Sequence, residues 1–272
     1  MIFSSIKPSP SLEVFVRDYL IAHFIFDNQK PLPVKPYAPK PEQGITFFIK
    51  GGATMVSSKT GIKQAPPVSI FGQQLSKCNI HLSNEFLMLR VHLKPGILFR
   101  LLKIPVFEFS DDYFNAEWVL DHNVLEVREQ LNEAVSYNEM IHVVENYLLK
   151  IIKKIKDEVH PVDKIAHYMT NENMHFSLDW LANQACLSPR QFNRKFTERM
   201  GVGPKHFSRL VRFYNAYLYK KTHPGIDWLS VAINFGYADY QHLVKDFKQF
   251  AEATPNLWIQ EEESSPENLL RL

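Results

Sequence analysis

Two stretches in the C-terminal half decide the fold: LDWLANQACLSPRQFNRKF at residues 178–196 and DWLSVAINFGYADYQHLVKDF at residues 227–247. Each begins with a short segment that contains a small residue, Ala182 or Ala232, and passes through a tight turn into a second helical segment. Apolar residues four apart lie on one face of that second helix. The small residue lets the two helices cross closely, and the opposite face of the second helix stays free. Both stretches therefore predict a helix-turn-helix.

The residues around these stretches also predict helices. Ser177, Ser188, Asp227 and Asp239 each precede a helical pattern, and their side chains suit the N-cap position. Pro189 is favourable in a first helical turn. The predicted helices span residues 162–171, 178–185, 189–200, 204–222, 228–235 and 240–250. The sequence thus predicts an all-α C-terminal domain with two helix-turn-helix units over residues 162–260.

The charge of this domain is unevenly distributed. The 272 residues include 31 Lys+Arg and 29 Asp+Glu, for a net charge of +2. Residues 186–221 nevertheless hold nine basic residues against one acidic residue, Glu198, which leaves +8. The glutamates at 261–263 offset part of this excess. A concentration of positive charge predicts a polyanion-binding surface, with a solvated helix face as the alternative.

Residues 160–259 resemble the DNA-binding domain of AraC/XylS-type transcriptional regulators. The resemblance includes both helix-turn-helix stretches, GVGPKHF at 201–207, RFYNA at 212–216 and the closing run FKQFAEATPNLW at 247–258. The chain has Ala251 where the family often has Gly, and Trp-Ile at 258–259 where it often has Tyr-Arg. Both departures lie outside the expected base-reading positions, so they concern local packing.

The resemblance implies that two recognition helices, at about residues 189–200 and 239–250, enter successive major grooves on one face of DNA. A connecting helix of about 19 residues is roughly 28 Å long, comparable with the groove repeat of about 34 Å. Arg suits guanine, and Asn or Gln suits adenine. The predicted DNA-binding residues are Arg190, Asn193, Arg194 and Lys195 in the first helix and Tyr240, Gln241, His242 and Lys245 in the second.

Other residues of the domain are predicted to have different roles, and for each DNA-binding residue a solvated side chain is the alternative. Phosphate contacts or solvated charges are expected for Lys195, Arg199, Lys205, Arg209 and Arg212. Core positions, rather than base-stacking ones, are expected for Phe192, Phe196, Leu243, Phe247, Trp180 and Trp228.

Residues 1–158 predict a β-rich domain that ends in a helical hairpin, so the whole chain is assigned to the α+β class. Strands are predicted at 45–49, 68–71 and 86–93, an extended proline-rich arm at 31–41, and a short helix at 97–102. One helix follows the apolar residues Leu125, Val127, Leu131 and Val135, and Asn138 is the expected N-cap of the next. The apolar stripe of this hairpin is expected to be core, or else a dimer surface. Through residues 43–49 and 91–96 the domain resembles the small β-rich domains attached to some AraC-type proteins, which implies a cupin-like or related partial barrel.

The N-terminal domain is expected to sense an effector or to dimerise. Arg90 and His92 share one strand face, and with Arg100 they are candidates to receive an anion, although no effector-binding residue is assigned. The aromatics Phe24, Phe26, Tyr37, Phe47 and Phe71 are interpreted as core rather than pocket. His23, His81 and His92 are isolated and lack the metal pattern of cupins, so neither a metal nor another cofactor is expected.

The leading hypothesis is a sequence-specific transcription regulator controlled by its N-terminal domain. GxGxxG, GxxxxGK, GxSxG and HExxH do not occur in the sequence, and an enzyme is not expected. The alternatives are a small-molecule-binding or enzymatic N-terminal domain that the DNA-binding module targets, and an interaction module without salt-dependent affinity for DNA. Double-stranded DNA is the expected partner, together with RNA polymerase, a small effector and a second copy of the chain. The low cysteine count, two in the chain, and the absence of a leader pattern indicate a cytoplasmic protein. No stretch approaches about 20 apolar residues, so no membrane partner is expected.

Overall fold

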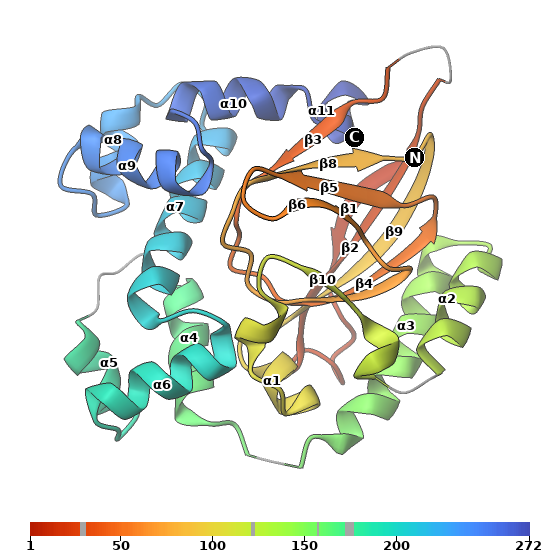
Figure 1. Ribbon diagram of the computed structural model, residues 1–272, viewed down its shortest axis with the longest axis horizontal. Coiled ribbons are helices and arrows are strands. Elements are labelled where there is room, and N and C mark those ends of the chain that lie inside the picture. The colour runs from red at the N-terminus through yellow and green to blue at the C-terminus, as the bar shows by residue number, and fades with distance from the viewer. Residues whose placement is uncertain (28–30, 121–122, 157, 172–176) are drawn as a thin grey trace.

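The computed structural model describes residues 1–27, 31–120, 123–156, 158–171 and 177–272. A β-rich N-terminal part lies beside a helical C-terminal part, whose first helix begins at Pro161 (Figure 1). The predicted α+β class is confirmed, with two sheets in the first part and helices in the second.

The strands of the described residues form two antiparallel sheets. The six-stranded sheet has the order β1 (Ile2–Ile6), β2 (Val16–Ile25), β9 (Glu85–Leu93), β4 (Gly44–Lys50), β7 (Val68–Phe71) and β10 (Tyr113–Asn115). The four-stranded sheet has the order β3 (Val34–Tyr37), β8 (Cys78–Leu82), β5 (Ala53–Ser57) and β6 (Gly61–Gln64). The proline-rich arm therefore contains a strand that the sequence did not predict. Pro36 is tolerated there because β3 is an edge strand.

Both faces of β9 are buried, because the strand separates two apolar layers. Leu87, Leu89, Val91 and Leu93 belong to the core on the helical side of the six-stranded sheet. The alternate residues of β9 face the space between the two sheets, since successive side chains point to opposite faces. There, Phe86 and Met88 join an apolar cluster, and Arg90 and His92 follow at the other end of the strand. The space between the sheets therefore has an apolar half and a polar half.

Helices cover the outer face of the six-stranded sheet. They are α1 (Ile97–Leu102), α2 (Asn123–Glu133) and α3 (Tyr137–Ile151), with short 3₁₀ segments at Val106–Phe109, Ala116–Trp118 and Ile152–Lys154. Leu148 and the rest of the α3 stripe are buried in this core, as the core interpretation predicted. The predicted N-cap was wrong, because Ser136, not Asn138, accepts the backbone N–H of Glu139. The predicted α2 stripe also ran too far, since the Val135 side chain is 93% exposed.

The C-terminal part consists of helices. They are α4 (Pro161–Asn171), α5 (Leu178–Gln184), α6 (Pro189–Met200), α7 (Pro204–Thr222), α8 (Trp228–Asn234), α9 (Tyr240–Phe250), α10 (Pro255–Glu263) and α11 (Pro266–Leu269). The predicted bounds of α6, α7 and α9 agree with the structure, and those of α4, α5 and α8 differ by one residue at one end. The sequence did not predict α10, which Thr254 caps, or α11.

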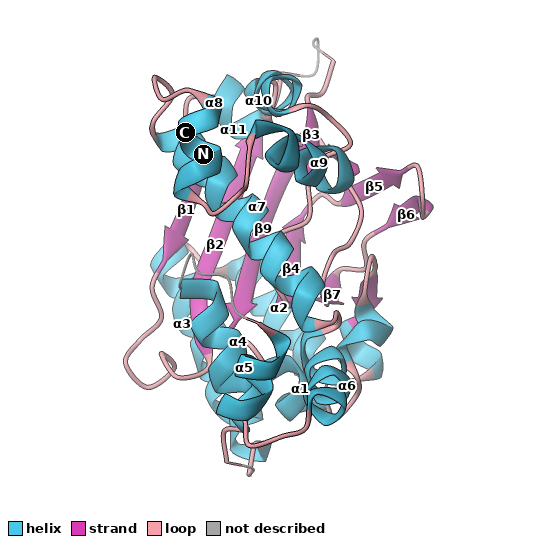
Figure 2. Cartoon of the chain, turned by 90° about the vertical axis from the view of Figure 1, so that its left-hand side faces the viewer, coloured by secondary structure: helices cyan, strands magenta, loops and turns pink. Residues whose placement is uncertain are grey.

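Helix α7 belongs to two apolar cores. Phe207 and Val211 pack with α4, α5 and α6, whereas Leu210 and Phe213 pack with α8, α9 and α10. The helix therefore joins the two helix-turn-helix units from within their cores. Figure 2 shows α7 running from the α4–α6 group to the α8–α10 group. The predicted core residues are confirmed as buried for Phe192, Phe196, Leu243, Phe247 and Trp228. The prediction that Trp180 is a core residue was wrong, because Trp180 is 41% exposed and lies beside Tyr168.

Candidate nucleic-acid interface and interdomain cavity

The first recognition helix, α6, is well defined at both ends. Ser188 accepts the backbone N–H of Gln191, and the Gln191 side chain accepts the N–H of Ser188, which forms a capping box. At the other end Gly201 closes the helix at a φ of 83°, a left-handed conformation that favours glycine. These ends position a polar outer face. Its predicted DNA-binding residues Arg190, Asn193 and Arg194 are exposed, and Lys195 is half-buried.

The second recognition helix, α9, begins at Asp239, whose carboxylate accepts the backbone N–H of His242 at 2.7 Å. Gln241 and Lys245 are exposed, whereas Tyr240 and His242 are half-buried. The His242 ring is already engaged, because its Nε2 lies 3.3 Å from Arg212 Nη2. The second outer face therefore offers Gln241 and Lys245 freely, and His242 only in part.

The tight turn is built differently in the two units. Cys186 and Gly236 each follow the small helical residue by four positions, and both are left-handed, with φ of 53° and 71°. Glycine adopts this conformation without steric cost, whereas a side chain is strained there by about 1–2 kcal/mol. The first turn thus contains backbone strain that the second avoids.

Each unit is held together by a buried aspartate and arginine. In the first, Asp163 of α4 accepts two hydrogen bonds from Arg199 of α6, both 2.5 Å long. In the second, Asp246 of α9 is fully buried and pairs with Arg209 and Arg212 of α7, at 2.5 and 3.1 Å. Arg199 and Arg212 are therefore internal clamps, and the expectation of phosphate contacts or solvated charges was wrong for them. No local pattern indicates these pairs, because the partners lie 36 and 34 residues away in the sequence.

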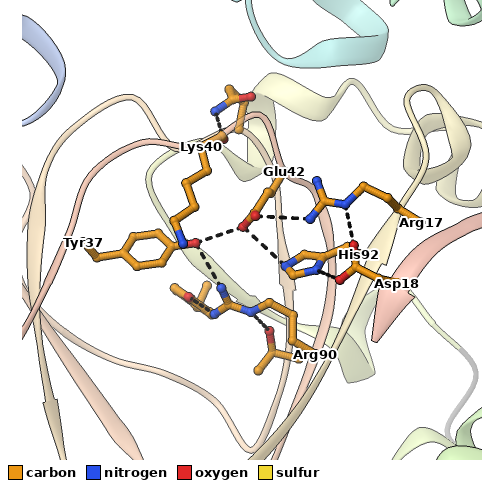
Figure 3. Close-up of polar contacts among 10 residues, drawn as sticks. Arg17, Asp18, Tyr37, Lys40, Glu42, Arg90 and His92 are labelled. Atoms are coloured by element: carbon orange, nitrogen blue, oxygen red, sulfur yellow. Dashed lines mark hydrogen bonds and ion pairs between the residues drawn. The ribbon is translucent and has the colours of Figure 1, made fainter. Parts of the chain in front are cut away.

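The polar half of the space between the sheets contains a cluster of charged side chains (Figure 3). His92 is its centre. Its Nδ1 lies 2.7 Å from Asp18 Oδ1, and its Nε2 lies 3.3 Å from Glu42 Oε2, an ion-pair distance without hydrogen-bond geometry. Arg17 bridges the same two carboxylates, at 2.6 Å from Asp18 Oδ2 and 3.2 Å from Glu42 Oε1. His92 and Arg17 thus each contact both carboxylates of the cluster.

Arg90 continues the cluster toward the apolar half. Its guanidinium donates to Thr46 Oγ1 at 3.0 Å, to Tyr37 Oη at 3.1 Å and to the Tyr113 hydroxyl. Tyr37 in turn donates to Glu42 Oε2 at 3.1 Å. Arg90 and His92 do lie on one strand face as predicted, but their polar atoms bond to the protein itself. Arg100, the third candidate, is buried in α1 and does not line the cavities described below.

The cations of the cluster keep its carboxylates ionised. Burial alone would raise the pKa of Asp18, but the hydrogen bond and charge of His92, followed by Arg17, lower it to about 2. Burial would likewise raise the pKa of Glu42, and the charges of His92, Lys40 and Arg17 hold it well below its ordinary value. The ionised state of both carboxylates therefore depends on the basic side chains around them.

A cavity of about 470 Å³ lies between the cluster and α7. It is lined by residues of both domains, among them Lys35 and Lys40 from the arm and Tyr214 and Tyr217 from α7. Lys40 also lines the apolar space between the sheets, where a smaller cavity of about 40 Å³ remains among Phe24, Phe86 and other apolar side chains. The Lys40 ammonium lies 4.7 Å from the Tyr37 ring centre and 5.9 Å from that of Tyr214.

The aromatic residues predicted as core divide between core and cavity. Phe47 is fully buried in the core under the helices, whereas Phe24, Tyr37 and Phe71 line cavities. Phe26 packs against the apolar cluster between the sheets. Within the described ranges, no three His, Cys, Asp or Glu side chains are grouped as a metal site.

Comparisons with known proteins agree with this architecture. Residues 181–261 match the family of helix-turn-helix domains, and residues 4–115 match a domain family of unknown function. The chain resembles the structure of ToxT from Vibrio cholerae, with 13% identity and a TM-score of 0.52, over 89% of this chain and 98% of that one. ToxT in complex with (E)-4-(8-methylnaphthalen-1-yl)but-3-enoic acid gives 12% identity and a TM-score of 0.51, over 90% and 99%. No curated protein sequence matches the chain.

The helix-turn-helix match and the two outward-facing recognition helices support a DNA-binding transcription regulator. Proteins of this class are not typically enzymes. The match over residues 181–261 supports the AraC/XylS-type DNA-binding domain that the sequence predicted. None of the helices in the described residues is long and apolar enough to cross a membrane.

Proposed function

We propose that the chain binds double-stranded DNA by placing α6 and α9 in successive major grooves on one face of the duplex. The observation that supports this proposal best is that both outer faces present exposed polar side chains, while α7 packs in both cores and sets the separation of the two helices. The 19 residues of α7 are roughly 28 Å long at 1.5 Å per residue. This length, with the width of the two units, suits a groove repeat of about 34 Å.

Individual side chains have different roles in this proposal. Arg190, Asn193 and Arg194 of the first helix read base edges, and Lys195 at the margin of that face contacts phosphate. In the second helix Gln241 and Lys245 read bases, and the half-buried Tyr240 and His242 add contacts at the edge. The first unit has more arginine and lysine, so it supplies most of the salt-dependent affinity.

The experiment begins with selection of bound duplexes from random DNA by the full-length protein. Arg194→Ala and Lys245→Ala are then compared on the selected duplex and on random DNA. We expect each to weaken the specific complex by about 1–3 kcal/mol and random binding much less. Lys150→Ala, which removes an exposed charge from α3, serves as the matched control. Wild-type affinity for both reader variants would refute the two-helix arrangement, and equal losses on both DNAs would assign the residues to phosphates.

We further propose that the N-terminal domain controls DNA binding through a small acid with an apolar body. The supporting observation is Lys40, which carries its charge between the interdomain cavity and the apolar space and forms no hydrogen bond from its ammonium to the described residues. The naphthalenyl butenoic acid bound by ToxT has this chemistry. Lys40→Met should therefore weaken binding of this acid tenfold or more, and unchanged affinity would exclude the assignment. RNA polymerase and a second copy of the chain remain predicted partners.

A further inference from the structure

The chain returns to the N-terminal domain after the helix-turn-helix match ends at residue 261. The last helices, α10 and α11, lie beside β3 in Figure 1. The acidic run at 261–263 is mostly paired. Glu261 forms an ion pair with Lys77, and Glu262 accepts a hydrogen bond from Tyr217 at 2.8 Å and lies 3.5 Å from Lys221. The run thus serves as a docking surface rather than a solvated tail.

Glu267 of α11 makes the deepest of these contacts. Its carboxylate forms an ion pair with Lys35 of β3, and the two side chains are only 6% and 13% exposed. One carboxylate oxygen, Oε2, is buried without a hydrogen-bond partner in the described part of the chain. An unsatisfied buried oxygen is unfavourable. The contact therefore removes the Glu267 carboxylate from water but provides a partner for only one of its two oxygens.

Lys35 stands at the entrance to the space between the sheets. It lines both that apolar space and the interdomain cavity, and its ammonium lies 5.4 Å from the ring centre of Phe3. Leu270, which follows Glu267 by three residues, packs against the apolar cluster between the sheets. The end of the chain thus presents one carboxylate and one apolar side chain to the same entrance. Together they reproduce the two chemical features of an amphiphilic acid.

We propose that residues 265–272 are an internal occupant of the effector site, which Lys35 and Lys40 line together. Glu267 takes the position of an effector carboxylate on Lys35, and Leu270 covers the apolar space. This inference rests on the proposed effector function. An acid enters by displacing the segment, because its carboxylate and that of Glu267 compete for the same position beside the Lys35 ammonium. Since α11 continues from α10, which packs in the core of the second helix-turn-helix unit, displacement is transmitted directly to that unit.

The test uses the full-length protein and (E)-4-(8-methylnaphthalen-1-yl)but-3-enoic acid, with binding followed by the fluorescence of the naphthalene ring. Glu267→Gln keeps the shape of the segment but removes its charge, so the acid should bind at least tenfold more tightly. Glu263→Gln is the matched control, because Glu263 is exposed on the preceding helix. The uncharged methyl ester should bind all three proteins equally, since it cannot compete for Lys35.

Hydrogen exchange of residues 265–272 provides the second measurement. The segment should lose protection when wild-type protein is saturated with the acid, and Lys35→Met should release it without the acid. If the acid binds wild type and Glu267→Gln with equal affinity while the segment stays protected, the internal-occupant proposal is wrong and the effector proposal stands. If the acid binds neither protein, the effector proposal fails and the internal-occupant proposal fails with it.

Discussion

The buried carboxylate of Asp246 offers the sharpest test of how the second helix-turn-helix unit is held together. The substitution Asp246→Asn keeps the size of the side chain and one acceptor oxygen but removes its charge. Asp246 is fully buried and faces two arginines of α7. Arg209 is one third exposed and can turn toward water, so its loss of a partner costs little. Arg212 is only 9% exposed and loses its carboxylate inside the protein.

The expected loss follows from that difference. Removing one member of a buried ion pair costs about 3–5 kcal/mol. We place Asp246→Asn at the lower end, about 3 kcal/mol, because the amide oxygen still accepts a hydrogen bond and only one arginine stays buried. A loss of this size lowers the folding equilibrium constant of the unit by about a hundredfold. For a domain of about 100 residues it also lowers the melting temperature by roughly 12–24 °C.

Urea unfolding followed by circular dichroism and tryptophan fluorescence measures the loss. Asp239→Asn is the control, because asparagine and aspartate are equivalent N-caps and α9 should keep its stability. A double-mutant cycle with Arg212→Gln should give a coupling energy of at least about 1.5 kcal/mol. A loss below about 1 kcal/mol for Asp246→Asn, or additive effects in the cycle, would refute the clamp.

Three further predictions concern strain, pH and close packing. Cys186→Gly should raise the free energy of unfolding by up to about 1 kcal/mol by relieving a φ of 53°, and a decrease measured in urea would contradict this. Because the pKa of Asp18 falls from 3.8 to about 2 on folding, its contribution of about 2 kcal/mol is present above pH 4 and lost as the pH falls to 2. Asp18→Asn should abolish that part of an acid titration. Gly96→Ala should lower the free energy of unfolding by at least about 2 kcal/mol, since φ is +80° and the new Cβ would lie 2.0 Å from Asp163 Oδ1. The control Gly225→Ala, whose new Cβ meets open space, should be nearly neutral in thermal unfolding.

The sequence predicted most of the helices in the DNA-binding domain because their signals are local. Caps such as Ser188 and Asp239 and a four-residue apolar spacing act within one or two turns, and the bounds of α6 and α9 agree with the structure. The roles of the arginines were harder to predict. Arg199 lies on an amphipathic helix whose charged residues are expected to be exposed. Its side chain is buried only because it pairs with Asp163, 36 residues earlier in the sequence.

The candidate site in the N-terminal domain was predicted only in outline. Alternation along β9 placed Arg90 and His92 on one face, but their carboxylate and hydroxyl partners come from other strands and from the arm. The acidic run at 261–263 was interpreted as a charge offset, because no local pattern shows that Lys77 of the other domain pairs with Glu261. Long-range pairing of this kind depends on the tertiary fold, which a single sequence does not display.

The membership of α7 in two cores has a consequence for the DNA target. A helix turns 100° and advances 1.5 Å per residue, so its length determines both the distance and the angular phase between the two units. One residue inserted into α7 would rotate the second recognition helix by about 100°, away from the face of the duplex that the first one occupies. In the proposed docking, the spacing of the two half-sites is therefore set by the number of residues in α7, and we expect an operator with different spacing to be bound only through bending or twisting of the DNA.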